Sequence, residues 1–225
     1  MVATAFVFDS LALTYDDWFD DAGKLIFAIE VQAISPILAL LSKPWLEVGV
    51  GSGRFAQSLG IDIGLDPSIE LLKMARKRDV GVFLGRGEET PLKDSVFGAV
   101  FLIATLCFVD SPLRVLAEVN RLLKEDGKIV LGLVERESPW GQLYQTKKGE
   151  GHNFYQYAAF YSFGQARALL EQAGFTIEEV LSTLFQRPGE VEALETPKSG
   201  FSPDAGFVVI TGRKSSRRVE VQLLP

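Results

Sequence analysis

Three closely spaced glycines after an apolar segment constrain this chain more than any other feature. Residues 46–53 read Leu-Glu-Val-Gly-Val-Gly-Ser-Gly, which predicts a buried strand, a tight loop and then a helix that begins near Arg54. Glycine is needed where a Cβ would block the backbone conformation or the close approach of a ligand. The helix that follows presents unpaired N–H groups to the crevice. The segment therefore predicts a ligand site that includes Gly49, Gly51, Ser52 and Gly53.

The glycine spacing and one carboxylate distinguish two kinds of ligand. Dinucleotide-binding loops follow G-x-G-x-x-G and hold a pyrophosphate at the helix N-terminus. Here the third glycine comes one residue early, and Arg54 stands at the fingerprint position. Glu47 would repel a pyrophosphate but attract a ligand that carries an ammonium and a sulfonium group. S-adenosylmethionine is such a ligand and has no phosphate, so we expect it as cofactor, with S-adenosylhomocysteine as product.

A second acidic residue follows the next predicted strand. Gly64-Leu65-Asp66-Pro67-Ser68 ends that strand, and Asp66 lies about as far past the loop as the ribose-binding acid of nucleotide folds. A carboxylate at this place can accept hydrogen bonds from both ribose hydroxyls. We expect Asp66 and Pro67 to contact the nucleoside. The alternative is a glycine turn plus a helix-capping aspartate in an ordinary α/β protein.

Composition narrows the functional class. The chain has 225 residues, 47% hydrophobic and 23% charged, which suits one α/β domain. A net charge of −6 gives no basic field for nucleic acid, and one cysteine with one histidine argues against a disulfide or a metal site. The N-terminus lacks the positive region of a signal peptide, and the longest apolar run, residues 99–109, is too short to span a membrane. We expect a cytoplasmic monomer or homodimer that binds neither nucleic acid nor membrane.

Strand and helix patterns alternate along the chain. After the strand before the glycine loop, apolar spacing predicts strands at 61–65, 80–84, 97–104, 128–134, 175–184 and 207–213, and helices at 25–34, 37–41, 68–78, 112–123 and 165–173. This order predicts an α/β fold with a doubly wound, mostly parallel, Rossmann-like sheet and helices on both faces. No helix pattern separates the last two strands, so we expect an antiparallel element at the edge. Tyr15–Phe19 is expected to precede the first helices.

With these residues in view, the chain resembles the class I S-adenosylmethionine-dependent methyltransferases. It is most similar to the methyltransferase type 11 group, typified by the ubiquinone and menaquinone C-methyltransferases. The resemblance runs from about Tyr15 to Gly212 and includes the glycine loop, residues 64–68 and residues 85–92 (Gly-Arg-Gly-Glu-Glu-Thr-Pro-Leu). It implies seven strands with an antiparallel seventh.

The resemblance also assigns cofactor residues and shows two departures. It implies contacts to the cofactor from Gly87 and Glu88, and a tyrosine, here Tyr15, that closes over it. The family's adenine-contacting aspartate falls on Arg86, and the acidic residue before the fourth strand is Gly98. Because arginine cannot accept a hydrogen bond from the adenine amino group, Glu88, a backbone carbonyl or a stacked Arg86 would have to serve instead.

Methyl transfer from a sulfonium needs alignment and exclusion of water more than a dedicated nucleophile. The site is expected at the carboxyl ends of the strands, with Thr105 beneath the methyl donor. The aromatic segment 136–163 stands where the family often places an acceptor lid, so we expect Cys107, Trp140, Tyr144 and Tyr155 to line the acceptor pocket. The alternatives are a buried thiol and an aromatic cover or dimer contact. His152 is the natural general-base candidate, although a solvent-facing loop histidine is the simpler interpretation.

The sequence divides one domain into a helical cap (1–44), the sheet body, the lid (136–163) and a tail (214–225). The favoured function is methylation of a small molecule, with the methylated atom (N, O, S or C) left open. The alternatives are an S-adenosylmethionine-binding regulator or partner subunit without catalysis and, less favoured, an NAD-dependent oxidoreductase.

Overall fold

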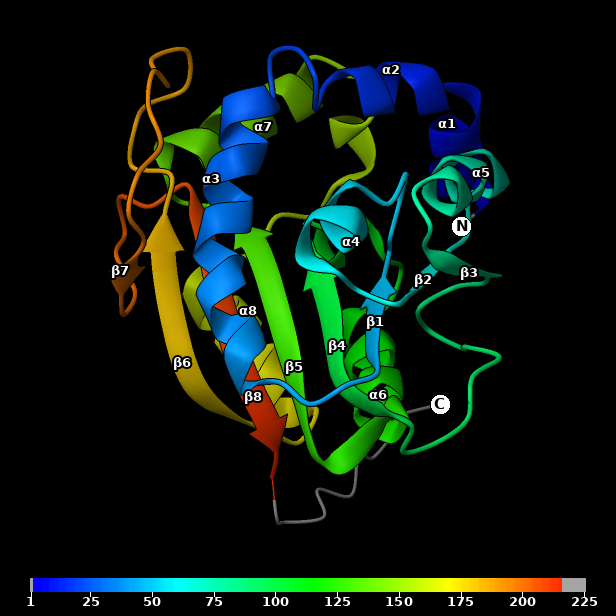
Figure 1. The fold of residues 1–225 in the computed structure, drawn as a ribbon. Coiled ribbons are helices and arrows are strands. Elements are labelled where there is room, and N and C mark those ends of the chain that lie inside the picture. The colour runs from blue at the N-terminus through cyan, green and yellow to red at the C-terminus, as the bar shows by residue number, and fades with distance from the viewer. Residues whose placement is uncertain (1, 216–225) are drawn as a thin grey trace.

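An eight-stranded sheet runs through the computed structural model, which describes residues 2–215 (Figure 1). The strands are β1 (Trp45–Val48), β2 (Ile63–Asp66), β3 (Gly81–Leu84), β4 (Phe97–Ile103), β5 (Leu123–Val134), β6 (Phe175–Thr183), β7 (Lys198–Ser199) and β8 (Phe207–Lys214). Their spatial order is β3-β2-β1-β4-β5-β8-β6-β7. The first five pair in parallel, whereas β8 is antiparallel to both of its neighbours. The Rossmann-like fold expected from the sequence is confirmed.

The antiparallel strand is β8, which lies between β5 and β6, so the last two predicted strands form the antiparallel end of the sheet that the sequence indicated. It pairs with β5 from Phe207 to Arg213 and with β6 along its other side. Residues 207–212 are all buried, and the unbroken apolar run of residues 207–210 is typical of a strand covered on both faces. The edge belongs to the two-residue β7, which pairs with Leu181 and Ser182 of β6.

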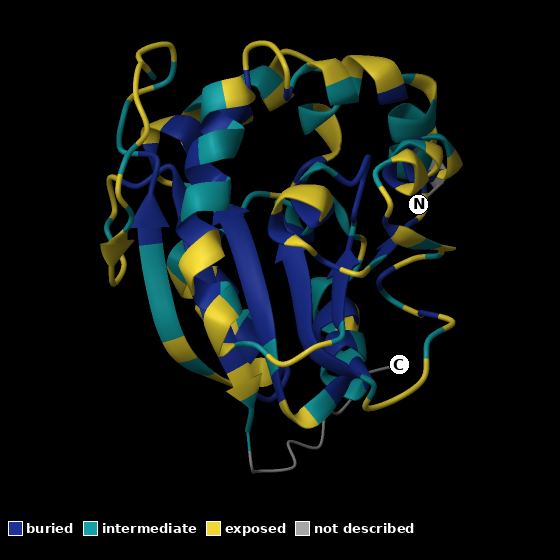
Figure 2. Ribbon diagram, viewed as in Figure 1, coloured by how far each residue is buried: buried dark blue, intermediate teal, exposed yellow. Residues whose placement is uncertain are grey.

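Helices cover both faces of the sheet, and β1, β4 and β8 are almost wholly buried, whereas β3 and β7 at the edges are mostly exposed (Figure 2). The helices are α1 (Val2–Ser10), α2 (Ala12–Asp17), α3 (Lys24–Ile34), η1 (Ser35–Leu40), α4 (Arg54–Leu59), α5 (Ile69–Lys77), η2 (Leu106–Phe108), α6 (Pro112–Leu122), α7 (Pro139–Gly149), η3 (Tyr155–Tyr157) and α8 (Phe163–Gln172). Side chains of α3, α4, α5 and α7 share one core with one face of the sheet. Those of α6 and α8 form the core of the opposite face.

The ends of the chain differ in part from expectation. Tyr15 does not precede the first helices but lies inside α2, which follows α1. Sequence periodicity missed α1 because its apolar residues are spread around the helix and form no stripe. Residues 216–225, most of the predicted tail, lie outside the described residues. Within the described range, none of the helices combines the length and apolar character needed to cross a bilayer.

Gly98, where the family has an acidic residue, lies in β4 against the backbone that leads into β1. Its N–H donates to the carbonyl of Pro44 at 2.9 Å, and a Cβ at this position would overlap the carbonyl of Ser42. The close backbone approach therefore excludes any side chain at this position.

We expect Gly98→Ala to lower the free energy of unfolding by about 1–3 kcal/mol, because an added Cβ would push the Ser42 backbone away from β4. Urea denaturation measures this. Gly149→Ala is the matched control, since a Cβ at Gly149 meets no atom within 4 Å. Equal stability of the two variants would contradict the packing argument.

Candidate functional site

The glycine loop lies at the carboxyl end of β1 and adopts the backbone conformation that its sequence predicts. Gly49, Gly51 and Gly53 have φ angles of 78°, 53° and 83°, which L side chains rarely adopt. A Cβ on Gly49 would also overlap the side chain of Thr105, which donates a hydrogen bond from Oγ1 to the Gly49 carbonyl at 3.4 Å. The loop and the end of β4 are thus in direct contact, which places Thr105 beside the loop.

Asp66 stands at the end of β2 and turns its carboxylate toward the glycine loop. One oxygen accepts a hydrogen bond from the N–H of Gly51 at 2.9 Å, and the other accepts from the N–H of Ser68 at 2.8 Å. Burial raises the pKa of Asp66 to about 6, although these hydrogen bonds oppose the rise. A carboxylate has about four lone-pair positions, so Asp66 can accept further bonds from ribose hydroxyls.

Glu47 lies in the middle of β1 and is 1% exposed. Its Oε2 has no hydrogen-bond partner anywhere in residues 2–215. Burial, and then the nearby Asp66, raise the pKa of Glu47 well above its usual range. A buried carboxyl oxygen without a partner costs free energy, and a positively charged ligand group would compensate for it. The site therefore fits a cation and would reject a pyrophosphate.

Tyr15 covers this site from the N-terminal cap. Its hydroxyl lies 3.2 Å from the place where a Cβ on Gly51 would stand. The ring packs edge-on against Phe8 and Phe19, with centroids 5.4 Å apart in both pairs. Burial, followed by the charges of Asp66 and Glu47, raises the pKa of Tyr15. The cap therefore brings a neutral phenol beside both carboxylates.

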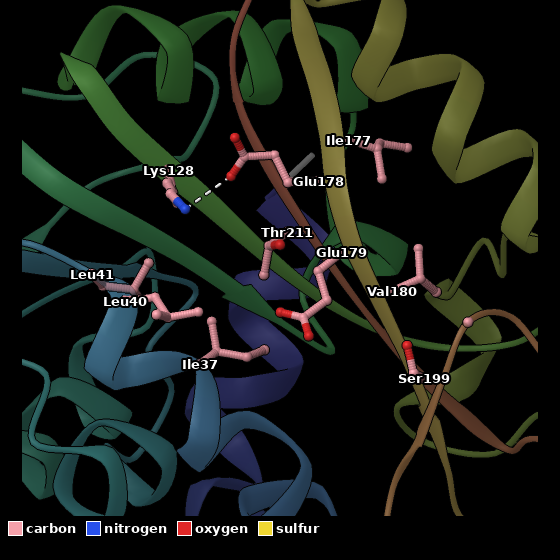
Figure 3. Close-up of a pocket in the computed structure, with 11 residues that line it drawn as sticks. Ile37, Leu40, Leu41, Lys128, Ile177, Glu178, Glu179, Val180, Ser199 and Thr211 are labelled. Atoms are coloured by element: carbon pink, nitrogen blue, oxygen red, sulfur yellow. Dashed lines mark ion pairs between the residues drawn. The ribbon is translucent and has the colours of Figure 1, made fainter.

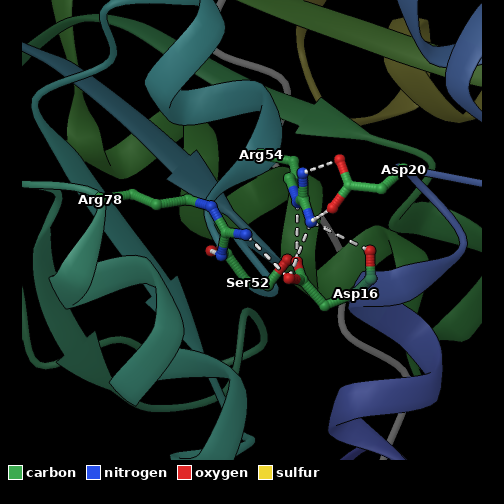
Figure 4. A network of polar contacts seen from close by, with 5 residues as sticks. All are labelled: Asp16, Asp20, Ser52, Arg54 and Arg78. Atoms are coloured by element: carbon green, nitrogen blue, oxygen red, sulfur yellow. Dashed lines mark hydrogen bonds and ion pairs between the residues drawn. The ribbon is translucent and has the colours of Figure 1, made fainter.

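A cluster of charged side chains, here called the clasp, joins the cap to the glycine loop (Figure 4). Arg54 donates to both carboxylate oxygens of Asp16, at 2.8 and 2.9 Å, and also to Asp20 at 2.6 and 2.8 Å. Arg78 donates to Asp16 at 2.7 Å and to the carbonyl of Ser52 at 2.8 Å. Burial alone would raise the pKa of Asp16, but hydrogen bonds from the two arginines hold it at about 2. Arg54, at the dinucleotide fingerprint position, therefore anchors the cap.

Arg86, which replaces the family's adenine-contacting aspartate, is engaged by two carboxylates. It donates to Asp110 at 2.5 Å and to Glu88 at 3.3 Å. Glu88 in turn accepts from the N–H groups of Asp110 and Ser111 at 2.9 and 3.3 Å. Gly87 packs beneath them, since a Cβ there would come within 2.9 Å of Val48. Glu88 thus holds the loop after β4.

The aromatic segment folds as α7 and η3 beyond the carboxyl ends of β4 and β5 (Figure 1). Tyr155 stacks on Tyr144 at a centroid distance of 4.4 Å and on His152 at 4.6 Å. Trp140 makes a different contact. Its indole N–H donates to the carbonyl of Gln186 at 2.8 Å, so it packs as part of the aromatic cover over the sheet. The structure thus brings Tyr144, Tyr155 and His152 together and places Trp140 beside them in the core.

The pKa shifts of Cys107 and His152 both favour the uncharged form of the side chain. The carbonyl of Cys107 accepts from the N–H of Ala159 at 2.7 Å, which joins η2 to the aromatic segment. Burial raises the pKa of the Cys107 thiol to about 12. Burial and then Lys147 lower the pKa of His152, whose Nδ1 accepts from the N–H of Phe154 at 3.3 Å. His152 is half-buried and not fully solvent-facing.

Sequence reasoning missed Glu30, which lies on α3 and is 7% exposed. Burial raises its pKa to about 8, and its charge raises the pKa values of both Tyr144 and Tyr155. The signal was present: Glu30 falls in the apolar stripe formed by Ile26, Ile29 and Ala33. An acidic residue in such a stripe indicates a buried carboxyl group.

A cavity of about 610 Å³ lies elsewhere, between η1 and β6 (Figure 3). It is lined by aliphatic residues such as Ile37 and Val180 and by Lys128, which forms a 2.8 Å ion pair with Glu178. None of the site residues predicted from the sequence lines it. The cavity is therefore separate from the glycine-loop site.

Comparison with known proteins decides the family. A family model described as a methyltransferase domain matches residues 46–131. A structure from Thermotoga maritima, described as an S-adenosylmethionine-dependent methyltransferase and possible histamine N-methyltransferase, is 38% identical, with a TM-score of 0.87 over 94% of this chain and 100% of that one. The chain belongs to the class I S-adenosylmethionine-dependent methyltransferases.

Two relatives without an assigned function are also similar to this methyltransferase. An uncharacterized protein of Mycobacterium tuberculosis is 40% identical over 89% of this chain and 71% of its own length. An uncharacterized protein of Methanocaldococcus jannaschii is 36% identical over 92% of this chain and 98% of its own. The likeness therefore extends well beyond the cofactor-binding core into the cap and the aromatic segment.

The clasp generates a prediction for this methyltransferase. We expect Asp16→Asn to lower the free energy of unfolding by about 1–3 kcal/mol, since it weakens hydrogen bonds to two arginines. Hydrogen exchange of α1 and α2 should become faster. Because the pKa of Asp16 is lowered in the folded state, its contribution is present above pH 4 and is lost as the pH falls toward 2. Asp17→Asn, at an exposed neighbouring position, is the control. Equal exchange rates in both variants would contradict the clasp.

The buried acidic residues of the methyltransferase predict a pH dependence of stability opposite to that of Asp16. Glu30 and Asp66 have pKa values of about 8 and 6, above their ordinary values, so the folded state binds protons more tightly than the unfolded state. Their contribution is present below about pH 4 and is lost as the pH rises through 6 and 8. We expect the free energy of unfolding to fall between pH 5 and 9, and Glu30→Gln to make this fall shallower. Urea denaturation tests this, with Glu190→Gln, an exposed loop residue, as the control. Parallel curves for Glu30→Gln and the wild type would count against a buried carboxyl.

Proposed function

We propose that this protein transfers a methyl group from S-adenosylmethionine to a small-molecule acceptor. The observation that carries the proposal is Glu47, a buried carboxyl with a partnerless oxygen, beside Asp66 at the glycine loop. Two acidic groups so placed would stabilise a cationic nucleoside and destabilise a phosphate. When bound, S-adenosylmethionine supplies an activated methyl group on a sulfonium.

The residues of the chain have separate roles in this proposal. Asp66 accepts hydrogen bonds from the ribose, with Pro67 beside it, and Glu47 neutralises the positive end of the ligand. The ligand approaches the backbone closely along the loop formed by Gly49, Gly51, Ser52 and Gly53. The rim of the site is formed by Gly87, Glu88 and Thr105. Tyr15 excludes water from above. Alignment and exclusion of water account for about 7–11 kcal/mol of barrier in favourable model reactions.

The acceptor side is formed by Cys107, Tyr144 and Tyr155, with Trp140 as the packed support behind them. Because the pKa of His152 is lowered, its ring is neutral at pH 7 and can accept a proton at Nε2. A small acceptor suits an enclosed aromatic surface and a chain with a net charge of −6. The proposal includes a cytoplasmic monomer or homodimer.

Binding measurements test the cofactor half. Isothermal titration calorimetry should detect S-adenosylmethionine and S-adenosylhomocysteine but not NADH. Glu47→Gln and Asp66→Asn should each weaken binding about 10-fold or more, since each loses a charged partner worth about 1.5–3 kcal/mol. Glu190→Gln should match the wild type. NADH binding in place of S-adenosylmethionine would contradict the proposal.

A transfer assay tests the catalytic half. Radiolabelled S-adenosylmethionine is incubated with a panel of amines, including histamine, and of phenols, thiols and activated carbon acids. Transfer of label to one class supports the enzyme. Tight cofactor binding without transfer to any compound would favour the alternative of a binding subunit without catalysis.

A further inference from the structure

Glu30 is the one buried carboxyl group on α3, and its environment is unusual. It is 7% exposed, and within residues 2–215 it forms no hydrogen bond or ion pair. The fully enclosed oxygen atoms without a partner include Gln32 Oε1 and Glu47 Oε2 but neither oxygen of Glu30. The Glu30 side chain therefore keeps only a small exposed area. No structural partner explains its burial, which costs free energy.

Aromatic rings stand next to this carboxyl. Ile26, Ile29 and Ala33 of the same helix share one buried core with Tyr144, and Tyr155 packs against that core. The charge of Glu30 also raises the pKa values of the Tyr144 and Tyr155 phenols, which agrees with this placement. The two rings stack at 4.4 Å, and Phe160 stacks on Tyr144 at 6.0 Å. A phenol oxygen can accept a hydrogen bond from an ammonium group, and a carboxylate beside the phenols adds a full opposite charge. The combination recognises an ammonium group better than a neutral or anionic one.

Tyr155 links this group of residues to the methyl-donor site. The preceding residue, Phe154, packs edge-on against Tyr15 with ring centroids 5.9 Å apart, and Tyr155 also raises the pKa of the Tyr15 phenol. Tyr15 in turn covers Gly51. A molecule held between Glu30 and Tyr155 would therefore reach toward the glycine loop and the methyl donor.

Lys147, a cation near these rings, does not fill this role. Lys147 Nζ lies 5.8 and 6.0 Å from the ring centroids of Tyr144 and Tyr155 but forms no ion pair with Glu30. Burial is the cause of the raised pKa of Glu30, and no charged neighbour contributes to it. The carboxyl is thus available to an outside cation.

We propose that Glu30, with Tyr144 and Tyr155, binds the ammonium group of the methyl acceptor, so that the substrates of this enzyme are small amines. Because the ammonium nitrogen has no lone pair, the methyl group goes to a second, uncharged nucleophilic atom of the same molecule, and the proton of that atom passes to His152 or to solvent. The inference rests on the proposed function and adds the substrate class. It also assigns a binding role to a residue that no sequence motif marks.

Calorimetry with paired probes tests the proposal in the presence of saturating S-adenosylhomocysteine. The probes are butylamine, 2-phenylethylamine and histamine, compared with butanol and 2-phenylethanol, which have similar shapes without the charge. We expect at least one amine to bind 10-fold or more tightly than the alcohols. Glu30→Gln should remove that preference, whereas Glu190→Gln should retain it. Glu30→Asp, which keeps the charge, should restore part of it.

Proton release gives a readout that a purely structural role would not change. Glu30 is mostly protonated at pH 7, because burial raises its pKa to about 8. An ammonium ion that pairs with it must ionise it, so close to one proton should leave per amine bound. Heats measured in phosphate and in Tris reveal this release, and Glu30→Gln should abolish it.

The outcomes separate this inference from the proposed function. Failure to bind S-adenosylhomocysteine would overturn the proposed function and the inference together. Normal cofactor binding with equal affinity for amines and alcohols, or with unchanged amine affinity in Glu30→Gln, would overturn the inference alone. Amine binding without proton release would also overturn it, since the ammonium would then lie away from Glu30.

Discussion

The site depends on two carboxyl groups held beside each other, for which residues 2–215 provide no ion-pair partner. Glu47 comes from the middle of β1 and Asp66 from the end of β2, and parallel pairing sets Glu47 opposite Gly64 and Val48 opposite Leu65. The pKa values of both groups are raised, mainly by burial. Folding therefore places an unfavourable electrostatic feature at the strand ends, and the surrounding sheet must be stable enough to keep it there. A cationic ligand relieves that feature, which links binding to the stability of the fold.

On the outer side of the glycine loop, by contrast, the acidic residues of the clasp are paired with arginines. Every acidic residue of the clasp faces an arginine, so Asp16 stays ionised while Asp66, across the loop, is pushed toward its protonated form. Arg54 belongs to the helix that follows the glycines, so the residue that departs from the dinucleotide fingerprint is also the one that holds the cap. The arginine at the fingerprint position and the attachment of the cap therefore depend on each other. A dinucleotide loop, with glycine at this position, would have no such anchor.

Most of the fold could be predicted because the local sequence patterns specify the same helices and strands that the sheet contains. The unbroken apolar run of β4, the helix stripe of α6 and the glycine loop each specify one element without reference to the others. The place of β8 could not be derived in this way, since pairing between distant strands depends on the whole sheet. The same limit applies to Glu30, because its neighbours Tyr144 and Tyr155 lie more than a hundred residues away. Gly98 depends on a distant residue in the same way, because the need for glycine at this position arises from the backbone of Ser42, which lies against it.

The proposed acceptor site follows from the charge of the proposed cofactor. A sulfonium and an ammonium that approach each other repel, and the low dielectric of a closed site strengthens this repulsion. Each cation therefore needs its own counter-charge, because a single carboxylate shared between them could neutralise only one. In the proposed arrangement Glu47 on β1 serves the cofactor and Glu30 on α3 serves the acceptor, with Tyr15 on the cofactor side and Tyr155 on the acceptor side. The two tyrosines exclude water without adding charge, since their raised pKa values keep both phenols neutral.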